Sequence, residues 1–213
     1  MKRRVLFRAM GVLCAMGVLG GGSSLVQAAD EAPDALIKRL SDDVLTSIKG
    51  DSAIKAGDIN RVIALVDAKI IPNVNFQGMT AAAVGPAWNQ ATPAQQKRLQ
   101  DEFKTLLVRT YSGALAQVDD QTISMKPQRS SPADTKVVVR TEIRGHGDPI
   151  QLEYRLEKTP GQGAGWKIYD INVLGVWLVG IYNGQFKQEI NSKGLDGLIA
   201  WLIERNKSNA KKA

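Results

Sequence analysis

Apolar residues recur at helical spacing in the first half of the chain. Leu, Ile and Val positions repeat every three or four residues over 36–48 and again over 59–70. A short Ala-rich helix is expected over 79–88. Thr-Pro-Ala-Gln at 92–95 has the form of a capping box, which predicts the start of a long helix whose apolar stripe continues to Val118.

After residue 120 the apolar period changes from helical to two. Apolar and polar residues alternate in four segments separated by short turns, which predicts an antiparallel meander with one apolar and one polar face. The segments are 121–126, 136–144, 150–157 and 166–173. Helical spacing returns at Val176 and is interrupted at Gly194.

Together these elements predict an α+β fold, in which helices pack over one face of a four-stranded antiparallel sheet. The hydrophobic fraction of 44% is ordinary for a globular protein. The aliphatic side chains between sheet and helices either fill a core or line an apolar cavity, and the pattern alone leaves both readings open.

The N-terminus has a different character. Basic residues at 2–8 precede a short apolar, Gly-rich run over 9–22, and small residues then fit cleavage after Ala28 or Ala29. This is the pattern of a secretory signal peptide, and the run is short for a bilayer span. A retained N-terminal anchor is the alternative, and export through either the general secretory or the twin-arginine route fits.

We therefore expect residues 1–29 to be a cleaved signal peptide, residues 30–206 a single domain, and residues 207–213 a Lys-rich tail. Removal of residues 1–29 takes away four of the 28 Lys and Arg residues and none of the 21 acidic residues, so the net charge falls from +7 to +3. The remaining basic residues interleave with acidic ones and form no stripe, which argues against nucleic-acid binding.

Candidate catalytic groups are few. The single Cys lies in the predicted signal peptide and the chain has one His, which argues against thiol catalysis and a His/Cys metal site. His146 stands in a Gly-His-Gly-Asp turn, and Asp170 interrupts an apolar strand, where a carboxylate needs partners. Either residue would serve a hydrolase, but a solvated turn His and a hydrogen-bonded structural Asp are the simpler interpretations. No cofactor motif is present.

Six stretches, in order along the chain, resemble the MlaC family, the periplasmic phospholipid-binding or "toluene tolerance" proteins of the Mla lipid-transport pathway. They are Val-Asn-Phe at 74–76, Trp-Asn-Gln-Ala-Thr-Pro-Ala-Gln-Gln at 88–96, Phe-Lys-Thr-Leu-Leu-Val-Arg-Thr-Tyr at 103–111, Gly-Trp-Lys-Ile-Tyr-Asp-Ile at 165–171, Gly-Val at 175–176 and Gly-Leu-Asp-Gly-Leu-Ile at 194–199. The chain departs from the family where Trp177 replaces a Ser. An indole there would narrow a cavity mouth or change the ligand.

The resemblance implies a periplasmic carrier, not an enzyme, that shuttles phospholipid between an outer-membrane lipoprotein complex and an inner-membrane ABC-transporter complex and so maintains outer-membrane lipid asymmetry. The sequence gives no evidence for a dimer, so we expect a monomer. A hopanoid-associated carrier and a hydrolase are the alternatives. The expected lining of its apolar cavity is Val74, Phe76, Trp88, Phe103, Leu107, Tyr111, Val139, Ile143, Leu152, Tyr154, Ile171, Val173, Val176 and Val179. Arg109, Arg140 and Lys167 are weaker candidates for a phosphate group or a docking partner.

Overall fold

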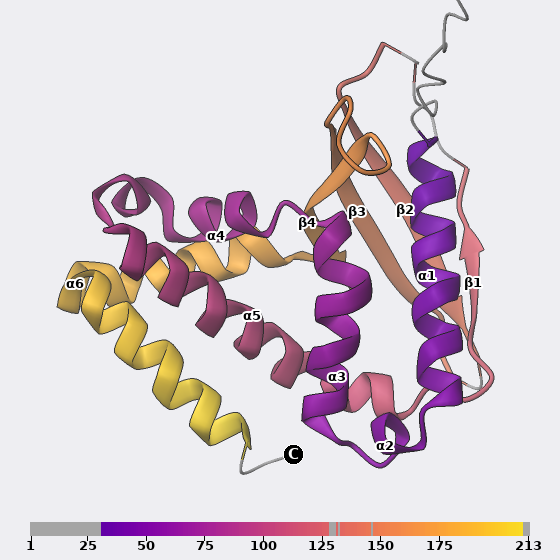
Figure 1. Ribbon diagram of the computed structural model, residues 1–213, viewed down its shortest axis with the longest axis horizontal. Coiled ribbons are helices and arrows are strands. Elements are labelled where there is room, and N and C mark those ends of the chain that lie inside the picture. Colours follow the sequence, from indigo (N-terminus) through magenta and orange to yellow (C-terminus); the bar gives the residue numbers. More distant parts are fainter. Residues whose placement is uncertain (1–30, 128–130, 132, 146, 211–213) are drawn as a thin grey trace, which may run out of the picture.

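The computed structural model describes residues 31–127, 131, 133–145 and 147–210, so the predicted signal peptide and His146 lie outside the described residues. The described chain has the predicted α+β fold (Figure 1). Its α-helices are α1 (Pro33–Gly50), α2 (Ser52–Lys55), α3 (Ile59–Leu65), α4 (Phe76–Val84), α5 (Pro93–Ala116) and α6 (Leu178–Ala210). Its strands are β1 (Thr122–Met125), β2 (Lys136–Arg144), β3 (Ile150–Lys158), β4 (Trp166–Val173) and β5 (Val176–Trp177).

The sheet is an antiparallel meander in the order β1-β2-β3-β4-β5. It has five strands and not the predicted four, because Leu174 and Gly175 form a two-residue turn that returns the chain for β5. Val176 therefore begins a strand and not a helix. Two residues are too few for an alternating pattern, so the sequence carried no periodic signal for this strand.

A bulge changes the face that β4 presents along its length. Ile168 pairs with Leu156, but Asp170 pairs with the next residue of β3, Arg155, so that Tyr169 is the extra residue. Ile168 and Ile171 consequently share the apolar inner face of the sheet, whereas Asp170 lies on the polar outer face with Arg155. Helix α1 packs against β1 and β2 on the inner face (Figure 1).

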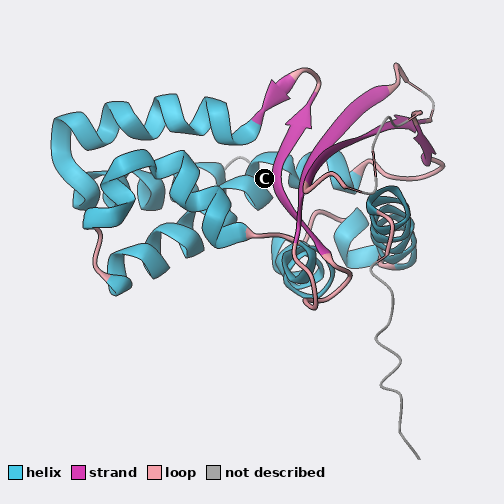
Figure 2. Ribbon diagram, turned by 90° about the horizontal axis from the view of Figure 1, so that it is seen from above, coloured by secondary structure: helices cyan, strands magenta, loops and turns pink. Residues whose placement is uncertain are grey.

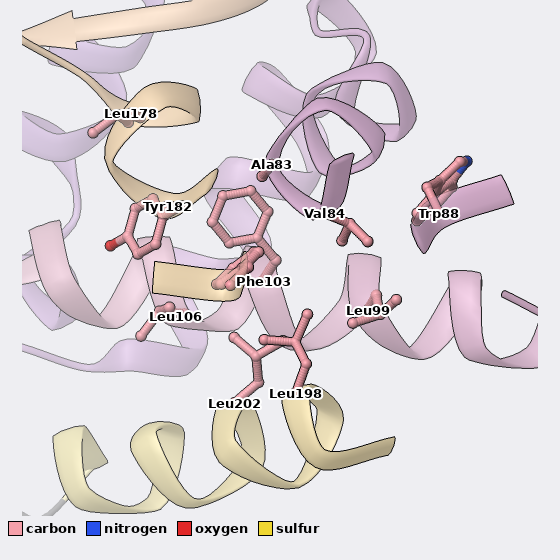
Figure 3. Close-up of a cluster of buried hydrophobic side chains, with 11 residues drawn as sticks. Ala83, Val84, Trp88, Leu99, Phe103, Leu106, Leu178, Tyr182, Leu198 and Leu202 are labelled. Atoms are coloured by element: carbon pink, nitrogen blue, oxygen red, sulfur yellow. The ribbon is translucent and has the colours of Figure 1, made fainter. Parts of the chain in front are cut away.

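The helices α4, α5 and α6 form a second layer beside the sheet (Figures 1 and 2). Phe103 of α5 lies at its centre and meets the rings of Tyr182 and Phe186 edge-on, at centroid distances of 5.0 and 5.2 Å. Figure 3 shows the surrounding aliphatic side chains pointing inward from all three helices. The predicted capping box is confirmed, because the Thr92 hydroxyl accepts from Gln95 N–H while the Gln95 side chain accepts from Thr92 N–H.

Helix α6 leaves the sheet directly from β5 and folds back on itself at Gly194 (Figure 2). Gly194 has φ 70° and ψ −171°, a conformation that essentially only Gly adopts. The break predicted at this residue is therefore confirmed. The helix extends to Ala210, so the first four residues of the predicted tail are helical.

The region between α3 and α4 is less regular than predicted. The single helix expected over 59–70 becomes α3, a π-helical turn over Val66–Ile70 and a 3-10 turn over Ile71–Asn73. The helix expected over 79–88 begins earlier, at Phe76, and ends in a 3-10 segment over Gly85–Gln90. None of the helices in the described part of the chain has the length and hydrophobicity that a bilayer crossing requires.

Candidate functional site

The inner face of the sheet carries four cross-strand rows of mainly apolar residues. In each row the residues are paired partners on neighbouring strands. The rows are Val137 with Leu156 and Ile168; Val139 with Tyr154 and Ile171; Thr141 with Leu152 and Val173; and Ile143 with Ile150. We number them one to four in this order. Val176 of β5 stands beside Val173 at the end of the third row.

Burial falls from the first row to the fourth. Every member of row one is buried, only Val139 and Thr141 are buried in rows two and three, and no member of row four is buried. Ile150 is 37% exposed and Val176 is 43% exposed. The apolar inner face is thus closed at one end and open at the end that carries the β4–β5 hairpin.

The helical layer meets these rows through half-buried apolar side chains. Phe76 and Ile171 pack against both the helical cluster and the cluster between α1 and the sheet, so they mark the junction of the two. Leu107 and Tyr111 of α5 and Val179 of α6 are also half-buried at the edges of these clusters. Apolar residues that retain accessible surface between two packed clusters can contact an apolar ligand, whereas fully buried ones cannot.

Tyr154, in the middle of the inner face, combines two properties. Burial raises the pKa of its phenol, against the smaller opposing effect of hydrogen bonds with Thr141 and Ser41. The side chain is nevertheless only partly buried by accessible surface. Tyr154 therefore lies among protein groups on the inner face and keeps part of its side-chain surface accessible. Burial also raises the pKa of Tyr111 on α5 and of Tyr182 on α6.

The structure brings together most of the predicted lining residues, but not all. Phe103 is fully buried at the centre of the helical layer. Trp88 lies at the end of that cluster away from Leu178, the residue at which α6 leaves the sheet (Figure 3). Val74, in contrast, bridges to Ile168 of β4 and belongs to the cluster under α1. Thus these three residues lie in closed packing, whereas the half-buried positions keep part of their surface accessible.

Ile150 is a residue of the inner-face rows that keeps accessible surface but was not among the predicted lining residues. Ile150 continues the series of Leu152 and Tyr154 along β3 and is more exposed than either of them. The alternation that identified Leu152 and Tyr154 also contained Ile150, so the signal was present in the sequence.

Two hollows on the described surface lie away from the inner face. One of about 280 Å³ is on the polar outer face beside Lys136 and Tyr169, and one of about 260 Å³ lies between α1 and α3 beside Ser47 and Leu65. The first has a mainly polar lining that includes Arg140, and neither contains a residue of the predicted apolar lining.

Asp170 is fully engaged in structural contacts. Its Oδ2 accepts from Arg155 Nη1 at 3.1 Å, and its Oδ1 accepts from the N–H groups of Ile171 and Val179 at 2.9 and 3.1 Å. The side chain is only 4% exposed. These contacts satisfy a buried carboxylate and leave it no free approach to a substrate, which agrees with the structural interpretation of this residue.

Trp177 lies on the outer face and not at the inner-face opening. It pairs with Asn172 across β4 and β5, and the guanidinium of Arg155 stacks on its indole at 3.8 Å from the ring centroid. The indole therefore completes the contacts of the Arg155–Asp170 pair. The expectation that it would narrow a cavity mouth is wrong, because the bulge in β4 and the short β5 place position 177 on the opposite face.

The three basic candidates each contact the protein itself. Arg140 Nε pairs with Glu153 at 2.6 Å on the outer face. Lys167 Nζ donates to the carbonyl of Pro72, and Arg109 Nη1 donates to the carbonyl of Asn206 between α5 and α6. None of these groups points into the inner-face rows.

Comparison with known proteins places this architecture. The family model described as "MlaC protein" matches residues 38–204. The toluene tolerance protein ttg2D of Pseudomonas putida is 22% identical over 180 residues, which cover 84% of this chain and 82% of the relative. The intermembrane phospholipid transport system binding protein MlaC of Haemophilus influenzae is 22% identical over 173 residues, 80% of each chain.

A solved structure gives a stronger match. The phospholipid-binding protein of Ralstonia solanacearum, determined in complex with a phospholipid, is 47% identical and superposes with a TM-score of 0.79. The match covers 83% of this chain and 98% of that one. With the family model spanning most of the described chain, these matches establish that this protein belongs to the MlaC family.

Proposed function

We propose that this protein binds a phospholipid with its acyl chains between the inner face of the sheet and helices α5 and α6, and carries it through the periplasm. The observation that supports this most strongly is the set of half-buried apolar rows that open toward the β4–β5 hairpin. A relative with 47% identity and nearly full coverage was solved with a phospholipid bound.

The lining in this proposal consists of the half-buried residues, with the buried ones behind them. Leu107, Tyr111 and Val179 would contact the lipid from the helices, and Leu152, Tyr154, Ile171 and Val173 from the sheet, with Phe76 between them. Ile143, Ile150 and Val176 would line the open end. Val74, Phe103 and Val139 would support this wall from behind, whereas Trp88 lies at the far end of the helical cluster.

The energetics require no chemistry from the carrier. An acyl chain gains about 0.8 kcal/mol for each methylene removed from water, so it must stay enclosed while it crosses an aqueous compartment. Moving it between a bilayer and an apolar protein interior changes this term little, because both surroundings are apolar. Direction would therefore come from partners, which we propose to be the outer-membrane lipoprotein complex and the inner-membrane ABC-transporter complex of the Mla pathway.

The hydrolase alternative has less support. Asp170 is buried in hydrogen bonds, and the family relatives bear names of binding and tolerance proteins. We propose a binding protein and not an enzyme, exported by the signal peptide at residues 1–29. A hopanoid-associated cargo differs from the main proposal only in the lipid that would be recovered.

Native mass spectrometry of the protein purified without detergent tests the function. We expect a mass increment of one phospholipid, confirmed by lipid extraction. A protein that carries no lipid and takes none up from vesicles would contradict the proposal. A mass increment of sterol-like size would indicate a hopanoid. Hydrolysis of the bound lipid, if the Asp170→Asn substitution abolished it, would indicate a hydrolase.

A further inference from the structure

The turn between β4 and β5 is built from an unexpected residue. Leu174 and Gly175 have φ values of 52° and 87°, and a two-residue hairpin loop with positive φ at both positions is a type I′ turn. Asn-Gly or Asp-Gly is the favoured pair there, because Asn and Asp tolerate the left-handed conformation. Leu174 is the only residue other than Gly with positive φ among the described residues.

Leu174 is also the most exposed large apolar residue of the described chain, at 65%. It thus combines an unfavourable backbone conformation with an apolar side chain in water, and neither property helps the isolated protein to fold. Strain that persists without a folding benefit points to a role in function.

Leu174 belongs to a larger apolar surface, which we call the hairpin patch. The described chain has four exposed large hydrophobic residues, which define this patch: Leu174 and Val176 on the hairpin, Ile150 near its turn, and Ile181 in the first turn of α6. The N–H of Leu174 donates to the carbonyl of Gln151, which brings the end of β3 to the turn. A Cβ placed at Gly175 or Gly180 would meet no atom within 4 Å, so the surface around the turn is open.

The segment that forms the hairpin and begins α6 also contains no charged residue. The sequence contains no Asp, Glu, Lys or Arg from Ile171 to Phe186, although 23% of the whole chain is charged. The patch adjoins the open end of the inner face, because Val176 and Ile150 belong to both. The exposed tip of the turn and the open end of the inner face are therefore neighbours in the sheet.

We propose that the hairpin patch enters the surface of a lipid bilayer, with Leu174 at the tip, so that an acyl chain passes between bilayer and inner face without crossing water. This inference rests on the proposed phospholipid-binding function. A protruding two-residue turn offers a convex surface, to which a fluid bilayer adapts, whereas a stable protein interface needs roughly 800 Å² of complementary surface on each partner. Four aliphatic side chains give a weak contact, which a carrier that must leave again requires.

The absence of charge gives the contact a specific signature. Binding through basic residues would strengthen with anionic lipid and weaken with salt. Contact through the hairpin patch should instead be equal on zwitterionic and anionic vesicles and insensitive to ionic strength.

The test compares the parent protein with Leu174→Asn and Leu174→Met. Asn suits the type I′ turn, so the first variant should be at least as stable as the parent in thermal unfolding. The second keeps an apolar side chain of similar volume and is the matched control. The readouts are flotation with phosphatidylcholine vesicles, with and without phosphatidylglycerol, and the rate of fluorescent-phospholipid transfer to them.

We expect Leu174→Asn to lower vesicle binding and the transfer rate by about ten-fold, because the bilayer no longer receives most of a Leu side chain. The amount of phospholipid bound per protein chain should stay unchanged. Leu174→Met should behave as the parent. Transfer by Leu174→Asn at the parent rate would overturn the proposal. The proposal would also be overturned if Leu174→Asn transferred phospholipid normally to vesicles and failed only in transfer to a protein partner. Flotation of lipid-free protein tests the contact between the hairpin patch and the bilayer even if the parent carries no phospholipid. A failure of the proposed phospholipid binding can therefore be distinguished from a failure of the bilayer contact.

Discussion

The carboxylate of Asp170 in β4 accepts a hydrogen bond from the backbone N–H of Val179, in the first turn of α6, at 3.1 Å. The first N–H groups of a helix have no partner within it, and a negative charge near them is favourable. One buried side chain of the sheet therefore fixes where α6 begins. Because Val179 and Tyr182 lie just beyond this point, the contact also sets the position of the helical wall of the proposed site.

Replacing Asp170 should destabilise the fold without removing a catalytic group. Asp170→Asn keeps the shape but loses the charge that pairs with Arg155, and we expect a loss of roughly 1.5–3 kcal/mol in the free energy of unfolding. Urea denaturation measures it, with Asp148→Asn at an exposed loop position as the control. An unchanged free energy of unfolding together with lost lipid turnover would instead assign Asp170 to catalysis.

Filling the inner face should displace the lipid. Leu152 lies half-buried in the third row, and Leu152→Trp adds an indole to the space that the acyl chains would occupy. We expect bound phospholipid to fall several-fold in native mass spectrometry, with thermal unfolding close to that of the parent. Val138→Trp on the outer face of β2 is the matched control. Equal lipid content in both variants would place the ligand elsewhere.

The turn within α6 should depend on Gly194 for backbone reasons alone. No atom lies within 4 Å of a Cβ at this position, so Gly194→Ala meets no steric obstacle. The backbone angles of φ 70° and ψ −171° are unfavourable for Ala, so the substitution should lower the free energy of unfolding by about 1–3 kcal/mol. Gly184→Ala, in an open position within the helix, should stabilise by about 0.5–1 kcal/mol. Chemical denaturation of both variants checks this pair of opposite signs. The account of the break fails if the two substitutions shift stability in the same direction.

Stability should fall in acid partly through Glu142. Hydrogen bonds from Lys126, and then from Arg144, hold the pKa of its carboxyl below the ordinary value of 4.5. A lowered pKa in the folded state means that the stabilisation is complete above pH 4.5 and is lost as the pH falls through the folded value. The midpoint of thermal unfolding, followed from pH 7 downward, should therefore drop less steeply below pH 4.5 in Glu142→Gln than in the parent. Glu204→Gln, at an exposed position near the C-terminal end of α6, should leave the pH dependence of the unfolding midpoint unchanged. If Glu142→Gln and the parent had the same pH dependence, Glu142 would not contribute to the loss of stability in acid.

The sequence predicted those parts of the fold that rest on local periodicity. The alternation in β2 fixed its bounds, and Thr92 with Gln95 fixed the start of α5, because a capping box needs only four consecutive residues. Long-range relations were not accessible in this way. The bulge at Tyr169 moves Asp170 to the outer face, and its partner Arg155 is fifteen residues away, so no periodic pattern could assign the role of Asp170 or the face of Trp177.

The lining was predictable only in part for a similar reason. Apolar residues at Leu152 and Phe103 give the same signal in the sequence, although the first is half-buried on the inner face and the second is closed within the helical layer. Which apolar side chains keep accessible surface depends on how two clusters meet. The packing of the two clusters depends on the position of α6, and hence on the contact between Asp170 and Val179.

The position of the bound acyl chains is measured most directly by photo-crosslinking with a phospholipid that carries a diazirine near the end of one acyl chain, followed by mass spectrometric mapping of the modified residues. If the acyl chains lie between sheet and helices, crosslinks should form to the inner-face rows and to the facing helices, at residues such as Leu107, Tyr154 and Ile171. Crosslinks confined to the outer face around Tyr169 and Trp177, or a protein that takes up no phospholipid, would contradict this placement of the lipid.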